Sequence, residues 1–60
     1  MEIETFTDST DGTHHIVLWI RDQIRTHDIY LAREDFETAL AELRRRYPTA
    51  LLIQSDDIAA

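Results

Sequence analysis

Three histidines and one neighbouring acid are the residues of this chain best suited to site chemistry. The imidazoles are His14, His15 and His27, and Asp28 follows the last of them. Neighbouring residues in a strand point to opposite faces, so His14 and His15 cannot share a metal ion. A set of His15, His27 and Asp28 is geometrically conceivable, but no HxH or HxxxH spacing supports it. We therefore interpret these residues as surface groups and predict no metal site and no cofactor.

Catalytic patterns are equally sparse. The two serines, Ser9 and Ser55, have no histidine and acid paired with them nearby in sequence. A single glycine excludes a glycine-rich phosphate loop. Residues 7–12 are similar to a calcium loop only superficially, because Thr7 occupies the first ligand position and Leu18 the twelfth. A chain this small rarely encloses a dry pocket. We predict that the protein is not an enzyme and has no catalytic residues.

The charge balance limits the partners. The formal net charge is −6, and the only basic cluster is Arg44, Arg45 and Arg46. Such a domain is repelled by nucleic-acid phosphates and by anionic membrane surfaces, so we expect neither as a partner. We interpret the acidic surplus as a solvated surface. The more specific alternative is a surface that imitates nucleic acid.

Composition also indicates a source and a compartment. All six cations are arginines, without one lysine or asparagine, which is typical of a GC-rich genome, and the acidic surplus is typical of a salt-adapted, halophilic cytoplasm. The first residues carry no secretory signal. The longest apolar run, residues 16–20, is far shorter than the roughly 20 residues needed to cross a bilayer. We predict a cytoplasmic protein.

The length predicts one domain over residues 1–60 that needs additional stabilisation. A chain of about 60 residues buries only roughly 60% of its unfolded surface. Cysteine is absent, so disulfides cannot supply the missing stability. Oligomerisation is the remaining common solution, and we expect a homodimer.

A β-hairpin is predicted at the N-terminus. Asp11-Gly12 is a favoured pair for a two-residue type I′ turn. Folding about it pairs Thr7 with Ile16, Thr5 with Leu18 and Ile3 with Ile20. These residues form one largely apolar face, and the other face carries Glu2, Glu4, Phe6, Val17, Trp19 and Arg21.

The segment 16–20 is apolar on both faces and rich in β-branched residues, which favours a strand covered on both sides. The alternative is a helix over residues 14–26 with Ile16, Ile20 and Ile24 as its stripe, but Leu18 falls outside that stripe. Residues 22–28 either turn the chain or lengthen the flanking strands. Residues 29–31 predict a short strand.

The clearest element is a helix that ends near residue 46. Its apolar stripe has helical spacing, and Pro48 cannot continue the helix; the stripe comprises Phe36, Ala39, Leu40, Leu43 and Tyr47. Ala32 occupies the position where a capping side chain is usual. Residues 50–53 predict a last strand and residues 54–60 a flexible tail. The predicted fold is α+β: a small antiparallel sheet in β-β-β-α-β order with one amphipathic helix on one face.

One helix can cover only one face of such a sheet, so the other face is the expected interaction surface. The residues predicted to bind there are Phe6, Val17, Trp19 and Arg21. A core position beneath the helix is the alternative for Trp19. We predict a homodimeric protein-protein interaction module or regulator with an unknown protein partner. The alternative is an acidic antagonist, or nucleic-acid mimic, that occupies a basic site on its partner.

Overall fold

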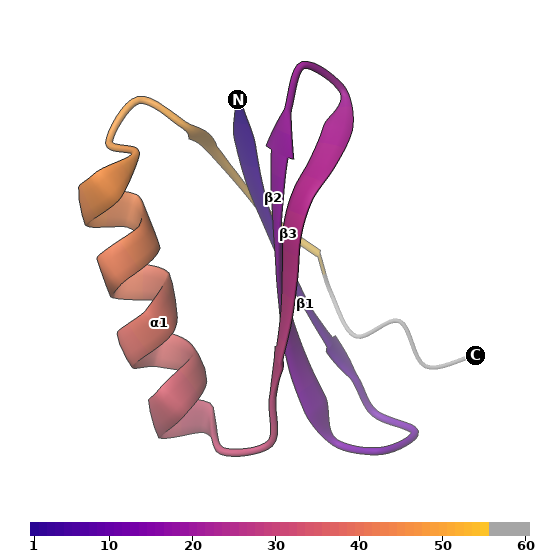
Figure 1. The fold of residues 1–60 in the computed structure, drawn as a ribbon. Helices are drawn as coiled ribbons and strands as arrows, with labels where there is room; N and C mark the ends of the chain where they lie inside the picture. Colours follow the sequence, from indigo (N-terminus) through magenta and orange to yellow (C-terminus); the bar gives the residue numbers. More distant parts are fainter. Residues whose placement is uncertain (56–60) are drawn as a thin grey trace.

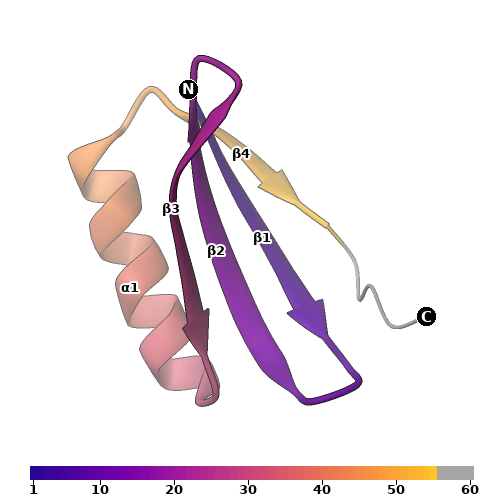
Figure 2. The ribbon, with the colours of Figure 1, turned by 45° about the vertical axis from the view of Figure 1, so that its right-hand side comes forward.

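The computed structural model describes residues 1–55 as one sheet with one helix. The elements follow in the order β1 (Glu2–Asp8), β2 (Thr13–Ile20), β3 (Gln23–Tyr30), α1 (Arg33–Arg46) and β4 (Leu51–Gln54). The strands lie in the order β3-β2-β1-β4 (Figure 2). The helix packs on one side of this sheet (Figure 1). The predicted α+β class, element order and single covering helix are confirmed.

The sheet is mixed, whereas the sequence predicted an antiparallel one. β1 and β2 pair antiparallel, as do β2 and β3, but β4 pairs parallel with β1. The parallel pairing results from the path of α1, which returns the chain along the sheet so that β4 starts at the same end as β1. Parallel neighbours need a crossover of this kind, and α1 supplies it.

The first hairpin has the predicted faces but a different register. Thr5 lies opposite Ile16 and Ile3 opposite Leu18, two residues away from the predicted pairing. The connection is a four-residue loop, in which the Gly12 N–H donates to the Asp8 carbonyl at 2.8 Å and Gly12 adopts a φ of +73°. Side chains alternate with a period of two, so this slip leaves the side chains of β1 and β2 on their predicted faces.

The two-residue turn occurs instead between β2 and β3. Its central residues, Arg21 and Asp22, have φ values of +53° and +62°, as a type I′ turn requires. The strand prediction for residues 16–20 is confirmed, and the helical alternative over residues 14–26 is wrong. β3 is longer than the predicted 29–31 strand, and its pairing with β2 contains an irregularity at Arg25.

The hydrophobic core lies between α1 and the sheet. Its buried members are Ile3, Ile16, Leu18 and Phe36. The remaining residues of the predicted helical stripe pack against this cluster and are partly buried, together with Ile20, Tyr30, Ala50 and Leu52. The amphipathic helix therefore covers one face of the sheet, as the spacing of its apolar residues predicts.

The helix ends also agree with the sequence. No side chain caps the N–H groups after Ala32, and the Tyr47 N–H donates to the Leu43 carbonyl at 2.9 Å where the helix ends. Gln54 belongs to β4, although the prediction assigned it to the tail. Residues 56–60 of the predicted tail lie outside the described part. No helix within residues 1–55 combines the length and apolar character needed to cross a membrane.

Substitution of Leu18 by alanine tests the position of the core. Leu18 is 2% exposed, so Leu18→Ala should lower the free energy of unfolding by about 2–5 kcal/mol, through lost burial and the cavity left behind. Leu31→Ala is the matched control, because Leu31 is 79% exposed and its loss should cost less than about 0.5 kcal/mol. Urea unfolding followed by circular dichroism measures both. Equal losses at the two sites would contradict this core.

Candidate functional site

The side of the sheet away from α1 has no helix or strand over it among residues 1–55 (Figure 1). We call this surface the open face. The strand register places its side chains in four rows across the sheet. The rows are Thr13-Asp8, then Ile29-His15-Phe6, then His27-Val17-Glu4-Ile53, then Ile24-Trp19-Glu2-Leu51. The open face is therefore apolar over much of its area, with two imidazoles and three carboxylates set into it.

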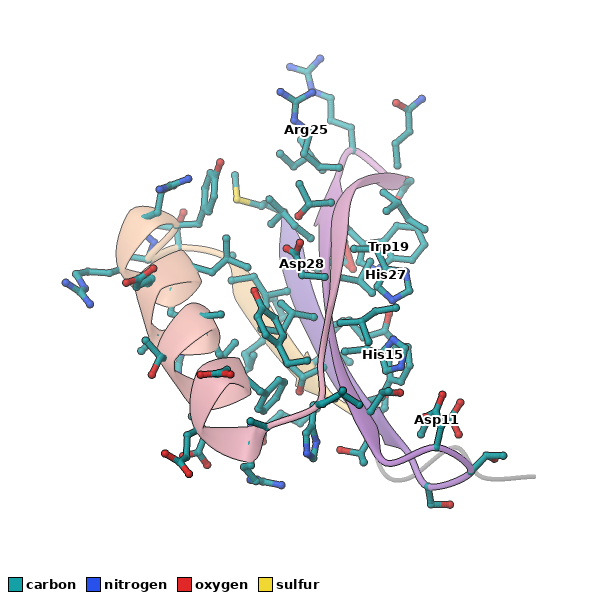
Figure 3. The ribbon with its side chains drawn as sticks, turned by 60° about the horizontal axis from the view of Figure 1, so that its bottom comes forward. Asp11, His15, Trp19, Arg25, His27 and Asp28 are labelled. Atoms are coloured by element: carbon teal, nitrogen blue, oxygen red, sulfur yellow. The ribbon has the colours of Figure 1, made fainter. Side chains whose placement is uncertain are left out.

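Three of the four predicted interaction residues lie on the open face. Phe6 and Trp19 are half-buried there, and Val17 is only 4% exposed. Trp19 is not beneath the helix, so the alternative reading of this residue is wrong (Figure 3). Arg21 does not belong to the face, because β2 ends at Ile20 and Arg21 lies in the turn that follows.

A carboxylate holds the indole ring of Trp19 in place. Its Nε1–H donates to Glu4 Oε1 at 3.1 Å, across the β1–β2 pair. The other oxygen of Glu4 accepts from the Ser55 hydroxyl at 3.4 Å, just after β4. An aromatic side chain that is already oriented loses less conformational entropy when a partner binds. The hydrogen bonds of Glu4 therefore orient Trp19 without a covering element.

A chain of four polar side chains runs from the first hairpin loop across the open face. The Thr13 hydroxyl donates to Asp11 Oδ1 at 2.6 Å and lies 2.7 Å from His15 Nε2. His15 Nδ1 in turn lies 2.9 Å from His27 Nε2 on the neighbouring strand. Figure 3 shows His27 and His15 on the side away from α1, with Asp11 beyond them in the loop.

The hydrogens of this chain have a defined direction. A threonine hydroxyl has one hydrogen, and Thr13 gives it to Asp11. The same oxygen must then accept from His15, so His15 Nε2 carries a hydrogen. In the neutral imidazole this leaves Nδ1 of His15 as the acceptor, to which His27 Nε2–H donates.

Aromatic contacts fix the plane of the His15 ring. Phe6 stacks on His15 with centroids 4.4 Å apart and an interplanar angle of 14°. His27 meets the Phe6 ring edge-on at 6.1 Å. This three-ring cluster and the Trp19–Glu4 pair flank Val17, which accounts for its burial on a face that no helix covers.

The other two members of the predicted polar set lie on the opposite side of the sheet. His14 hydrogen-bonds to Thr7 at 3.0 Å, and its ring lies 5.4 Å from that of Phe36. Asp28 also points to the helix side (Figure 3). Burial first, and then the negative charge of Asp28, raise the pKa of Tyr30 above its ordinary value. The structure therefore brings together His15 and His27, but not Asp28.

Sequence reasoning missed the contributions of Asp11 and Thr13. Both precede His15 at intervals of two residues, which is the spacing of side chains along one strand face. That spacing could have indicated that the three side chains lie close together. We did not use it, because the predicted two-residue turn at Asp11-Gly12 gave the Asp11 carboxylate no partner.

Thr13 lowers the pKa of Asp11, and a substitution can test this effect. The Thr13 hydroxyl is the largest cause, followed by the Thr13 backbone N–H, and together they hold the pKa of Asp11 below its ordinary 3.8. Thr13→Val removes the hydroxyl and keeps the backbone bond. We expect the pKa of Asp11 to rise toward 3.8, measured by NMR titration of its carboxyl carbon.

The stability that comes from this shift has a definite pH range. A carboxyl whose pKa is lower in the folded chain stabilises the fold above about pH 3.8, and the contribution disappears as the pH falls through the folded-state pKa.

Thr10→Val is the matched control for Thr13→Val, since only the backbone of Thr10 bonds to an acid, Asp8. An unchanged pKa of Asp11 in Thr13→Val would contradict the assigned hydrogen bond.

The comparisons with protein families, curated proteins and solved structures find no match to this chain. The open face is accordingly the basis on which its function is inferred.

Proposed function

We propose that this protein is a small, non-enzymatic, cytoplasmic protein-protein interaction module that acts as a homodimer, and that two copies associate through their open faces. The observation that carries the proposal is the uncovered apolar side of the sheet. Packing sheets face to face about 10 Å apart is a common way to bury such a side.

The exposed apolar area on this face supports the proposal. Ile29, Leu51 and Ile53 are 57%, 64% and 37% exposed, and they flank the ordered rings of Phe6 and Trp19. Scattered exposed apolar residues are normal, but a contiguous set of them usually marks an interface. The aromatic residues at its centre are of the type that dominates binding energy.

Charge placement favours a second copy as the occupant. The carboxylates of Glu2 and Glu4 lie on β1, while the imidazoles of His15 and His27 lie on β2 and β3. A twofold axis parallel to the strands would set β2 and β3 of one copy over β1 and β4 of the other. The half of the face that carries the imidazoles would then lie over the half that carries the carboxylates, twice, in the self-complementary manner of a twofold interface. Each row would face the same row of the other copy, so His15 would meet Phe6.

The small size of the chain gives a thermodynamic reason for association. One helix and one sheet enclose a single core with four buried apolar members in the described residues. Binding that occurs only in the folded state stabilises that state by mass action. A dimer would also provide the second cover that the apolar face of β2 requires.

Size exclusion with light scattering tests the dimer. The chain has a mass of 7.0 kDa, so the dimer should appear at twice this value, about 14 kDa, at low and at molar salt. Trp19→Glu should give the monomer, because it would bury a second carboxylate beside Glu4 in an apolar interface. Leu31→Glu is the control: Leu31 is exposed outside the strands, and its substitution should leave the dimer intact.

Salt separates this proposal from the acidic antagonist. An apolar sheet interface keeps or gains affinity as salt rises, whereas binding to a basic partner weakens steeply. A wild-type chain that stays at 7 kDa in both salts up to about 100 μM, well above typical homodimer constants, would contradict the dimer. Identical masses for Trp19→Glu and wild type would remove the open face as its interface.

A further inference from the structure

We propose that His15 and His27 form a binding site for a divalent transition-metal ion, such as Zn²⁺, Ni²⁺ or Cu²⁺, on the open face. The two nitrogens that would bind the ion are His15 Nδ1 and His27 Nε2, which lie 2.9 Å apart. Imidazole nitrogen is a favoured ligand of all three ions. Water completes the coordination.

The separation of the two nitrogens suits a shared metal ion. Two nitrogens that each lie about 2.0–2.1 Å from a tetrahedral zinc ion are roughly 3.3 Å apart. The observed 2.9 Å therefore needs to widen by only about 0.4 Å, which small rotations of two side chains supply. The rings are already tilted by 47° with centroids 5.2 Å apart, so they are not stacked face to face.

The surroundings of His15 resemble the outer shell of a metal ligand. A ligating histidine usually gives its other ring N–H to an oxygen that is itself tied to a carboxylate or carbonyl. His15 Nε2–H donates to the Thr13 hydroxyl, which donates to Asp11. This chain selects the tautomer whose Nδ1 lone pair points at His27. The stacked ring of Phe6 holds the imidazole plane.

Metal binding requires the hydrogen between the two rings to leave His27 Nε2. In the hydrogen-bonded pair, His27 Nε2 carries the hydrogen that His15 Nδ1 accepts. When a metal ion takes the Nε2 lone pair, His27 changes to the tautomer with its hydrogen on Nδ1. His27 is exposed, so solvent can exchange this hydrogen and the ion can enter.

The described residues supply two ligands and no third. Among residues 1–55 no group of three or more histidine, cysteine or acidic side chains is arranged to hold a metal. Asp28, which the sequence made conceivable as a third ligand, lies on the helix side of the sheet (Figure 3). The site is therefore a two-histidine chelate with positions open to water, and a chelate of this kind discriminates ions by their preference for imidazole.

Isothermal titration with ZnCl₂ and NiCl₂ tests the site in the full chain. Wild type should bind both ions, and His27→Gln and His15→Gln should each weaken binding at least tenfold. His27 is exposed, so its substitution should leave the fold intact, which circular dichroism verifies. His14→Gln is the matched control: it removes the adjacent imidazole on the other face and should leave the affinity unchanged.

A second readout locates the ion. Substoichiometric CuCl₂ should broaden the NMR signals of His15, His27 and Phe6 before those of His14. Absence of heat and of selective broadening up to millimolar metal, or equal weakening by His14→Gln and His27→Gln, would overturn the site. The metal site and the dimer fail separately: a wild-type dimer that binds no metal would overturn only the site, and a wild-type monomer that binds metal would overturn only the dimer.

Discussion

Strand β2 is apolar on both sides, and the chain has only one helix with which to cover it. Ile16 and Leu18 face α1 and are almost wholly buried, whereas Val17 and Trp19 alternate with them and face away. Strand geometry makes this division unavoidable, since successive side chains point to opposite faces. The core on one side and the open face on the other both follow from the apolar run of residues 16–20.

The open face is organised by its own polar contacts. Glu4 fixes the indole of Trp19, and the Asp11–Thr13–His15–His27 chain fixes the imidazoles beside Phe6. These contacts run along β2, between neighbouring strands and from the loop to β2, so the side chains are ordered without a covering element. Buried side-chain nitrogen and oxygen atoms without a hydrogen-bond partner are absent among the described residues. Under the proposed function this order favours binding, because little conformational entropy would be lost when a partner binds.

The sequence predicted most of the architecture because the decisive signals were local. The helical spacing of Phe36 to Tyr47 and the stop at Pro48 located α1, and the β-branched run located β2. The register and the turns were harder. Asp11-Gly12 was the obvious two-residue turn, yet the chain uses Arg21-Asp22, where two residues other than glycine accept positive φ. The position of the β2–β3 turn is set by the pairing of two eight-residue strands, and no two-residue sequence signal predicts that pairing.

The candidate site was predicted in part for the same reason. Phe6, Val17 and Trp19 follow from alternation alone, and an error of two residues in register does not move them. The contact between His15 and His27 depends on how β2 pairs with β3, including the irregularity beside Arg25. The two histidines are twelve positions apart in the sequence, so their contact is a tertiary contact that local sequence patterns do not predict. The parallel return of β4 is likewise set by the path of α1 over the sheet.

The fluorescence of Trp19, followed over a dilution series, tests the central claim that copies associate through the open face. Trp19 is the single tryptophan of the chain, so its emission reports on this surface alone. The dimer predicts that emission moves to longer wavelength, and acrylamide quenching increases, as the protein is diluted from about 100 μM to about 10 nM, concentrations that bracket typical homodimer constants. Emission and quenching that stay constant while light scattering shows dissociation would place the interface elsewhere.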